Sequence, residues 1–260
     1  MAGAADASSW DGDARSAVRL VAGSPDGAGS GMQRAGIEIR LATGWKTYWR
    51  YPGDSGVPPT FDFSTSENAK SVTILWPAPH RFTDDGGASI GYKGGVILPL
   101  HIVPEDPKRP VTLRLAIDYA VCEKLCVPAK GAAKLDLIRE STAYDAALAA
   151  AEAQVPRPAR LGEVSPFGIR TVRREPGSPH PRVVVEVAAS AATPLDLFVE
   201  GPTEEWALPL PEPIPGPSPD LRRFAFDLDG VPPGADAIGA HLRFTLVSGE
   251  KAIEVTTVLE

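Results

Sequence analysis

Hydrophobic and polar residues alternate in short segments along the chain. In the stretch GIEIRLA, Ile37, Ile39 and Leu41 point to one side. Glu38 and Arg40 point to the other side, which is the period of two of a strand with one buried face. Similar segments occur at residues 15–23, 34–42, 60–64, 71–76, 95–103, 111–121 and 132–138. Short strands separated by turns that contain Pro and Gly predict a β-sandwich.

One segment has a different pattern. Residues 141–160, STAYDAALAAAEAQVPRPAR, are rich in Ala, with Ser141 or Thr142 as candidate N-caps and Pro156 and Pro158 as stops. This pattern predicts a helix of about a dozen residues. Because it lies between two strand-rich blocks, it is interpreted either as an interdomain connector or as a helix packed on one edge of the sandwich.

Strand-like segments return after residue 165, and one of them, TLVSGEKAIEV, predicts a hairpin with Ser248-Gly249 at its turn. Residues 208–220 contain six prolines, which exclude a central strand and favour a stiff surface loop over a binding arm. The chain is therefore expected to be all-β, with two sandwich domains in tandem joined by a short helical and Pro-rich linker. The expected bounds are 1–140, 141–164 for the linker, and 165–260.

Composition restricts the class of partner. The formal net charge is −7 and the acidic residues are spread along the chain, whereas a nucleic-acid groove needs clustered Lys and Arg. No apolar run approaches the roughly 20 residues of a membrane span. We therefore expect no nucleic-acid partner and no membrane-spanning segment. The start MAGAADASSW lacks the basic and apolar parts of a signal peptide, but its polar character is typical of an exported protein after signal removal.

Motifs of common enzyme classes do not occur. The four histidines, His80, His101, His180 and His241, are scattered and show no metal-ligand spacing. Nothing resembles a Ser/His/Asp nucleophile elbow, a P-loop or a Rossmann turn. The run YPGDSG contains Asp and Ser but is first of all a turn. The cysteines are the remaining candidates for chemistry.

The two cysteines, Cys122 and Cys126, lie in the stretch DYAVCEKLCVPAKG. A fully extended chain would place their Cα atoms roughly 13 to 14 Å apart, whereas a disulfide needs about 4.4 to 6.8 Å. If they bond, the chain after strand 111–121 must form a tight turn. As a staple the bond would contribute only about 2 kcal/mol, because the closed ring is small.

A short, exposed ring is easier to reduce than a structural disulfide. Lys124 and Lys130 would favour the thiolate, and Glu123 would partly oppose them. Two thiolates would also suit Cu(I), although no Met or third Cys lies close in the sequence. The spacing alone therefore leaves three interpretations open: a redox couple, a structural disulfide and a copper site.

Three segments together resemble the N-terminal periplasmic domain of DsbD-type thiol:disulfide interchange proteins. They are GWKTYWRYPGDSGVPP (44–59), WPAPHRF…SIGYKGGVILPL (76–100) and DYAVCEKLCVPA (118–129). The ScsB-like branch is the most similar, because it carries the C-x3-C spacing found here, whereas DsbD itself has two cysteines further apart. Residues 165–260 match less closely, although ScsB-like proteins carry a second immunoglobulin-like domain there.

The resemblance implies an immunoglobulin-like fold and a redox function in the periplasm. The protein would be a component of a protein-disulfide reductase system, taking electrons from a membrane-embedded donor domain and passing them to thioredoxin-fold oxidoreductases. Cys122 and Cys126 would be the exchanging pair, with Cys126 facing the partner. No cofactor and no metal ligand are assigned. The alternative functions are copper binding by the same cysteines, since ScsB-like systems are linked to copper stress, and a non-catalytic interaction module with a structural disulfide.

The resemblance also implies an aromatic cap over the disulfide. Residues 79–94 correspond to the mobile cap loop of the family, with Phe82 as the candidate cap residue and Tyr92 as a second wall. Core packing is the alternative role for Phe82. Tyr119 lies three residues before the first cysteine, as an aromatic residue does in the family. Three aromatic residues of the first segment are interpreted as core packing beneath the loop, without chemistry: Trp45, Tyr48 and Trp49.

Overall fold

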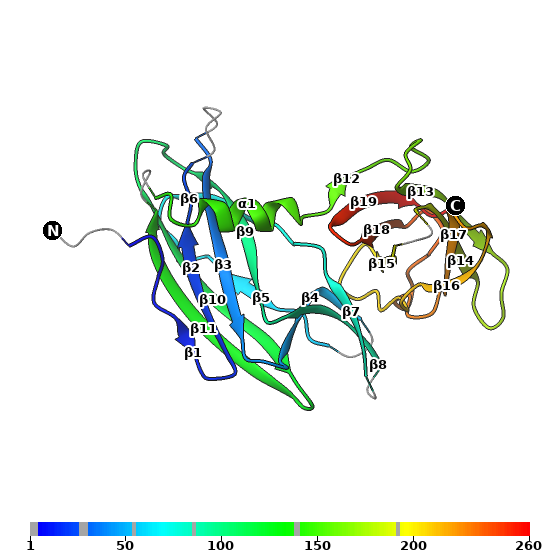
Figure 1. Cartoon of the computed structure of the whole chain (residues 1–260), viewed down its shortest axis with the longest axis horizontal. Coiled ribbons are helices and arrows are strands. Elements are labelled where there is room, and N and C mark those ends of the chain that lie inside the picture. The colour runs from blue at the N-terminus through cyan, green and yellow to red at the C-terminus, as the bar shows by residue number, and fades with distance from the viewer. Residues whose placement is uncertain (1–4, 26–30, 54–55, 85–86, 138–140, 191–192) are drawn as a thin grey trace. The chain divides into compact units, whose positions relative to one another are not determined.

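The computed structural model describes residues 5–25, 31–53, 56–84, 87–137, 141–190 and 193–260, and the chain forms two compact units (Figure 1). The first unit comprises Met1–Pro52, Gly56–Pro79 and Ile90–Val155. The second comprises Gly53–Ser55, His80–Ser89 and Pro156–Glu260. Strands build both units, which confirms the prediction of tandem all-β sandwiches.

Two sheets carry the first unit. One sheet has the order β1 (Asp11–Gly12), β2 (Ser16–Ala22), β3 (Gln33–Leu41), β9 (Gly95–Pro104), β6 (Ala69–Ile74). The other has the order β11 (Cys126–Leu137), β10 (Val111–Cys122), β4 (Lys46–Gly53), β8 (Gly87–Lys93), β7 (His80–Asp84), with β5 (Thr60–Asp62) paired to β10. The contacts of β7 and of the start of β8 group them with the second unit.

Strand β10 shows how the sequence builds this unit. Leu115 and Ile117 are buried, while Ala116 and Asp118 beside them are exposed, as in a strand with one buried face. From Tyr119 to Cys122 every residue is buried instead. This end of β10 pairs with β4, whose large side chains lie beside it. The change in pattern marks the place where the strand is covered on both faces.

The structure corrects two sequence predictions in the first unit. Strand β4 was not predicted, because Thr47, Tyr48 and Trp49 are buried in succession and give no alternation. The segment 79–94, expected to be a loop, contains strands β7 and β8. Gly91 weakens the strand signal of β8, yet the fold requires glycine there, since a Cβ would lie 1.9 Å from the carbonyl oxygen of Thr47.

The helix α1 (Asp145–Ala153) belongs to the first unit and packs on β9. Its Leu148 is completely buried. The guanidinium of Arg34 pairs with Glu152 at 2.7 Å. The expected N-caps are wrong: Tyr144 occupies the N-cap position without a side-chain capping bond, and the Ser141 hydroxyl donates to the carbonyl oxygen of Ala22 at 3.2 Å.

The second unit also has two sheets. One has the order β12 (Arg157–Pro158), β19 (Lys251–Val258), β18 (His241–Ser248), β15 (Asp196–Glu200). The other has the order β13 (Gly168–Glu175), β14 (Arg182–Ala188), β17 (Leu221–Asp227), β16 (Glu212–Ser218). The β18–β19 pair confirms the predicted hairpin. Fully buried residues from both sheets share one core, among them Val185, Leu197, Phe224, Phe244 and Val255.

The proline-rich segment is a strand, not the loop that the sequence favoured. Strand β16 pairs only with β17 and lies at the edge of its sheet. Pro213, Pro215 and Pro217 lie along it, and their nitrogens carry no hydrogen to donate to a further strand. An edge strand is the place in a sheet that tolerates such residues, so the exclusion of a central strand was right.

Arg81 explains why the segment His80–Ser89 groups with the second unit. Its guanidinium donates to the carbonyl oxygen of Pro211 at 2.9 Å and pairs with Glu212 at 2.7 Å. Asp196 lies 3.2 Å from its Nε. Because the side chain of Arg81 is only 14% exposed, these partners compensate the burial of its charge.

Candidate functional site

The site lies at the tip of the hairpin formed by β10 and β11. The ladder pairs Cys122 directly with Cys126, and Glu123–Leu125 form the turn between them. The two sulfur atoms are bonded, and the Cα atoms are 4.1 Å apart. The tight turn that a bond between the cysteines required is therefore present.

The two sulfur-bearing residues differ in their exposure. Cys122 is 6% exposed and packs in a small cluster with Tyr48 and Ala120. Cys126 is exposed to solvent. A partner thiolate can reach the exposed residue without displacing the core, so the geometry favours attack at Cys126.

Strand β4 supplies a polar group in contact with the disulfide. The hydroxyl of Tyr48 lies 3.0 Å from Sγ of Cys126, within hydrogen-bond distance for sulfur. Lys46, two residues earlier on the same strand, is 6% exposed and pairs in register with Cys122. A hydroxyl donating to sulfur favours the thiolate. Tyr48 is buried, as expected of a core residue, and the structure adds its contact with Cys126, which the sequence did not predict.

Tyr92 and Phe82, expected to wall and cap the disulfide, lie on β8 and β7. The hydroxyl of Tyr92 donates to the carbonyl oxygen of Pro77 at 2.8 Å, and burial raises the pKa of Tyr92 well above its ordinary value. The ring of Phe82 lies 6.4 Å from the ring of His80, in the segment grouped with the second unit. A capping role for either residue stays a prediction.

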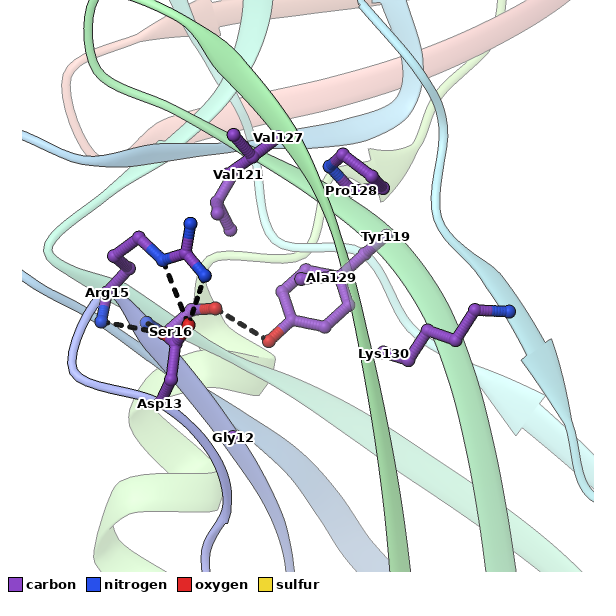
Figure 2. A pocket seen from close by; sticks show the side chains of 10 residues that line it. All are labelled: Gly12, Asp13, Arg15, Ser16, Tyr119, Val121, Val127, Pro128, Ala129 and Lys130. Carbon is purple, nitrogen blue, oxygen red and sulfur yellow. Dashed lines mark hydrogen bonds and ion pairs between the residues drawn. The ribbon is translucent and has the colours of Figure 1, made fainter.

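Tyr119 lines a cavity of about 240 Å³ beside the hairpin (Figure 2). Its hydroxyl lies 2.9 Å from the hydroxyl of Ser16, and burial raises the pKa of Tyr119. Hydrogen bonds from Arg15 and Ser16 lower the pKa of Asp13, in the same wall, to about 2. Figure 2 shows Tyr119 pointing toward Ser16, so its described contact is with β2 rather than with the disulfide.

The two lysines that the sequence expected to favour the thiolate are both exposed. The ammonium of Lys130 pairs with the carboxylate of Asp118 at 2.6 Å, so the negative charge of Asp118 offsets the positive charge of Lys130. Lys124 is exposed in the turn, together with Glu123. Neighbouring charges in the turn are screened by water. The hydroxyl of Tyr48, by contrast, is in direct contact with Sγ of Cys126.

The part of the chain that the structure describes contains neither a cluster of metal ligands nor a helix able to span a membrane. Within it, no group of three or more His, Cys, Asp or Glu side chains could hold a metal ion. No helix among the described residues is long and apolar enough to cross a membrane.

The segment that contains the hairpin matches a known family. Residues 19–137 match the family model described as thiol:disulfide interchange protein DsbD, N-terminal. Over these residues the chain is similar to the DsbD N-terminal domain. The matched range contains both cysteines, Tyr48, Lys46 and the whole β10–β11 hairpin, so the resemblance predicted from three sequence segments is confirmed.

A solved structure extends the likeness beyond the DsbD N-terminal domain. The crystal structure of the N-terminal periplasmic domain of ScsB from Proteus mirabilis is similar, with a TM-score of 0.75 and 21% sequence identity over 98% of each chain. At this identity the likeness shows the fold, and it covers both units. No curated protein sequence matches the chain significantly.

Proposed function

We propose that this protein exchanges thiols and disulfides in the periplasm, relaying reducing equivalents from a membrane-embedded donor to thioredoxin-fold oxidoreductases. One observation carries the proposal: a disulfide at a hairpin tip exposes Cys126 and buries Cys122 in a domain similar to the DsbD N-terminal domain. The compartment is supported by the periplasmic origin of the ScsB domain that shares the fold.

Each exchange would proceed in two balanced steps. A donor thiolate attacks Sγ of Cys126, the bond to Sγ of Cys122 breaks, and Cys122 leaves as a thiolate that takes up a proton. The second thiol of the donor then attacks the mixed disulfide and releases Cys126. The donor dithiol becomes a disulfide, and two electrons and two protons reside on Cys122 and Cys126.

Delivery to an acceptor reverses these steps. The thiolate of Cys126 attacks the disulfide of the acceptor and forms the mixed disulfide, and Cys122 resolves it from its buried position. The hydroxyl of Tyr48 stabilises negative charge on Cys126 whenever this sulfur attacks or leaves. Cys126 is thus the partner-facing sulfur and Cys122 the resolving one.

Trapping tests this assignment. The acceptor is a thioredoxin whose second active-site cysteine is replaced by serine and whose first is activated as a mixed disulfide with nitrothiobenzoate. Cys122→Ser should form a stable covalent complex and release the coloured thiolate, because Cys126 attacks and nothing resolves the product. Cys126→Ser should react at least about tenfold more slowly, since a buried thiol attacks poorly. Non-reducing electrophoresis and absorbance follow both reactions.

The outcomes separate the candidate functions. The opposite pattern of trapping would reverse the two roles. Complex formation by neither variant would exclude exchange with this fold and favour a structural disulfide. Tight binding of Cu(I) by the reduced protein, abolished in both cysteine variants, would instead favour the copper function.

A further inference from the structure

Leu125 is an apolar side chain that the fold does not use for packing. It occupies the turn inside the disulfide ring and is 79% exposed. Its turn neighbours Glu123 and Lys124 are exposed as well. Single exposed apolar residues are common on protein surfaces, so exposure alone assigns no role. Its place directly before the exposed Cys126 provides the argument.

The geometry of exchange places any protein partner against Leu125. A thiolate attacks along the line of the disulfide, so it must approach Sγ of Cys126 from the side away from Cys122. The opposite side is closed, because Cys122 packs with Tyr48 and Ala120. A partner that brings its sulfur to bonding distance therefore lies against the exposed tip of the hairpin, where Leu125 directly precedes the reacting Cys126.

A second exposed apolar side chain lies next in sequence to a residue that packs against Tyr48. A Cβ on Gly56 would lie 2.7 Å from the ring of Tyr48, so this part of the chain packs against the tyrosine that contacts Cys126. The next residue, Val57, is 59% exposed. Besides Leu125, an exposed apolar side chain therefore directly follows a residue that packs on the tyrosine in contact with Cys126.

We infer that Leu125 is the apolar anchor by which the protein docks thioredoxin-fold partners at the surface around their reactive cysteine. The inference rests on the proposed function. Encounters between redox proteins bury little surface, because the partners must separate after each transfer. In such a small interface a central apolar anchor supplies most of the affinity, while charged rim residues contribute little.

The test compares a protein reductant with a small one on the full chain. Reduction of the Cys122–Cys126 disulfide by dithiol thioredoxin, which itself becomes oxidised, is followed by stopped flow beside reduction by dithiothreitol. Leu125→Ser should slow the reaction with thioredoxin by about tenfold, which corresponds to about 1.4 kcal/mol. Its reaction with dithiothreitol should stay unchanged, because the small dithiol needs no docking surface. Val57→Ser should show the same selectivity with a smaller loss.

Two control variants keep the result specific. Leu125→Met preserves an apolar anchor of similar volume and should retain the rate with thioredoxin. Val103→Ser removes another exposed apolar side chain of the first unit, 43% exposed on β9 in the other sheet, and should not affect either reaction.

Each contrary outcome has a distinct meaning. If the unmodified protein reacts with thioredoxin and Leu125→Ser reacts equally fast, the docking inference is wrong while the proposed function stands. If Leu125→Ser slows both reductants equally, the substitution has altered the disulfide itself, and the inference is likewise wrong. If the unmodified protein exchanges with dithiothreitol but not with thioredoxin, and trapping also fails, the proposed function fails and the inference with it.

Discussion

The two sulfur atoms of one disulfide have different chemical surroundings. Burial of Cys122 keeps external thiols away from it and disfavours its charged form. Cys126 is open to water and lies 3.0 Å from the hydroxyl of Tyr48. A hydrogen bond to a charged group is worth about 1.5–3 kcal/mol. The pair is therefore polarised, with the thiolate favoured on the exposed sulfur.

Tyr48→Phe should raise the pKa of the Cys126 thiol. In the Cys122→Ser background, where Cys126 is the single thiol, loss of the hydroxyl should raise this pKa by about one to two units, since one unit corresponds to 1.36 kcal/mol. The rate of alkylation by iodoacetamide as a function of pH gives the pKa directly, because only the thiolate reacts.

Tyr92→Phe is the matched control for this measurement. The hydroxyl of Tyr92 donates to the carbonyl oxygen of Pro77, so its removal should leave the titration of Cys126 where it was. If the pH dependence of alkylation had the same midpoint with Tyr48→Phe as in the Cys122→Ser protein alone, the hydroxyl would not stabilise the thiolate.

At the level of elements, β8 fixes the strand that carries Tyr48. A Cβ on Gly91 would lie 1.9 Å from the carbonyl oxygen of Thr47 and 2.9 Å from Cα of Tyr48. Since the obstructing atoms are backbone, no side-chain rotation relieves the clash. The close approach of these two strands therefore sets the position of the Tyr48 hydroxyl relative to Cys126.

Gly91→Ala should destabilise the protein and impair the site together. Overpacking of this kind costs about 1–3 kcal/mol, and displacement of β4 should also slow the reaction of the disulfide with dithiothreitol. Denaturant unfolding measures the first effect and stopped flow the second. Gly168→Ala is the control, because its Cβ would have no neighbour nearer than 3.7 Å. A stable Gly91→Ala protein with an unchanged rate would contradict the proposed coupling of strand and site.

Among the strands, alternation of side chains is the clearest signal that the sequence offers. Strands β3 and β10 follow from their one-sided burial, and the cysteine pair follows from its spacing and its surroundings. Strand β4 has no alternation because it is buried on both faces at Tyr48. The contact of Tyr48 with Cys126 joins positions 78 residues apart, so no local pattern can reveal it. The helix was found, but its cap was not, because Tyr144 makes no capping bond that composition could signal.

At the level of the whole molecule, the first unit has a core that does not include the disulfide turn. Its fully buried side chains come from both sheets and include Leu20, Ile37, Trp49, Leu98 and Leu113. The turn itself is exposed, and the ring that the disulfide closes is short. Opening the bond therefore releases little chain freedom and should leave the fold intact, as a domain that cycles between two redox states requires.

Reduction should lower the free energy of unfolding of the first unit by about 2 kcal/mol, the loop entropy of so small a ring. Urea unfolding of the oxidised and dithiothreitol-reduced protein measures this difference. A Trp206→Phe background confines the tryptophan signal to the first unit, because Trp206 belongs to the core of the second and the other four tryptophans lie in the first.

The size of this difference decides between a redox couple and a staple. Folding and reduction form a closed thermodynamic cycle. Any free energy by which the disulfide stabilises the fold must therefore lower the reduction potential of the disulfide in the folded protein by the equivalent amount. For a two-electron couple, about 2 kcal/mol corresponds to about 40 mV relative to the unfolded chain. A disulfide whose reduction potential is lowered by only this amount remains reducible by a dithiol partner. A reduced first unit that unfolds without denaturant would instead mean that the fold depends on the bond, and the exchange function would lose its thermodynamic basis.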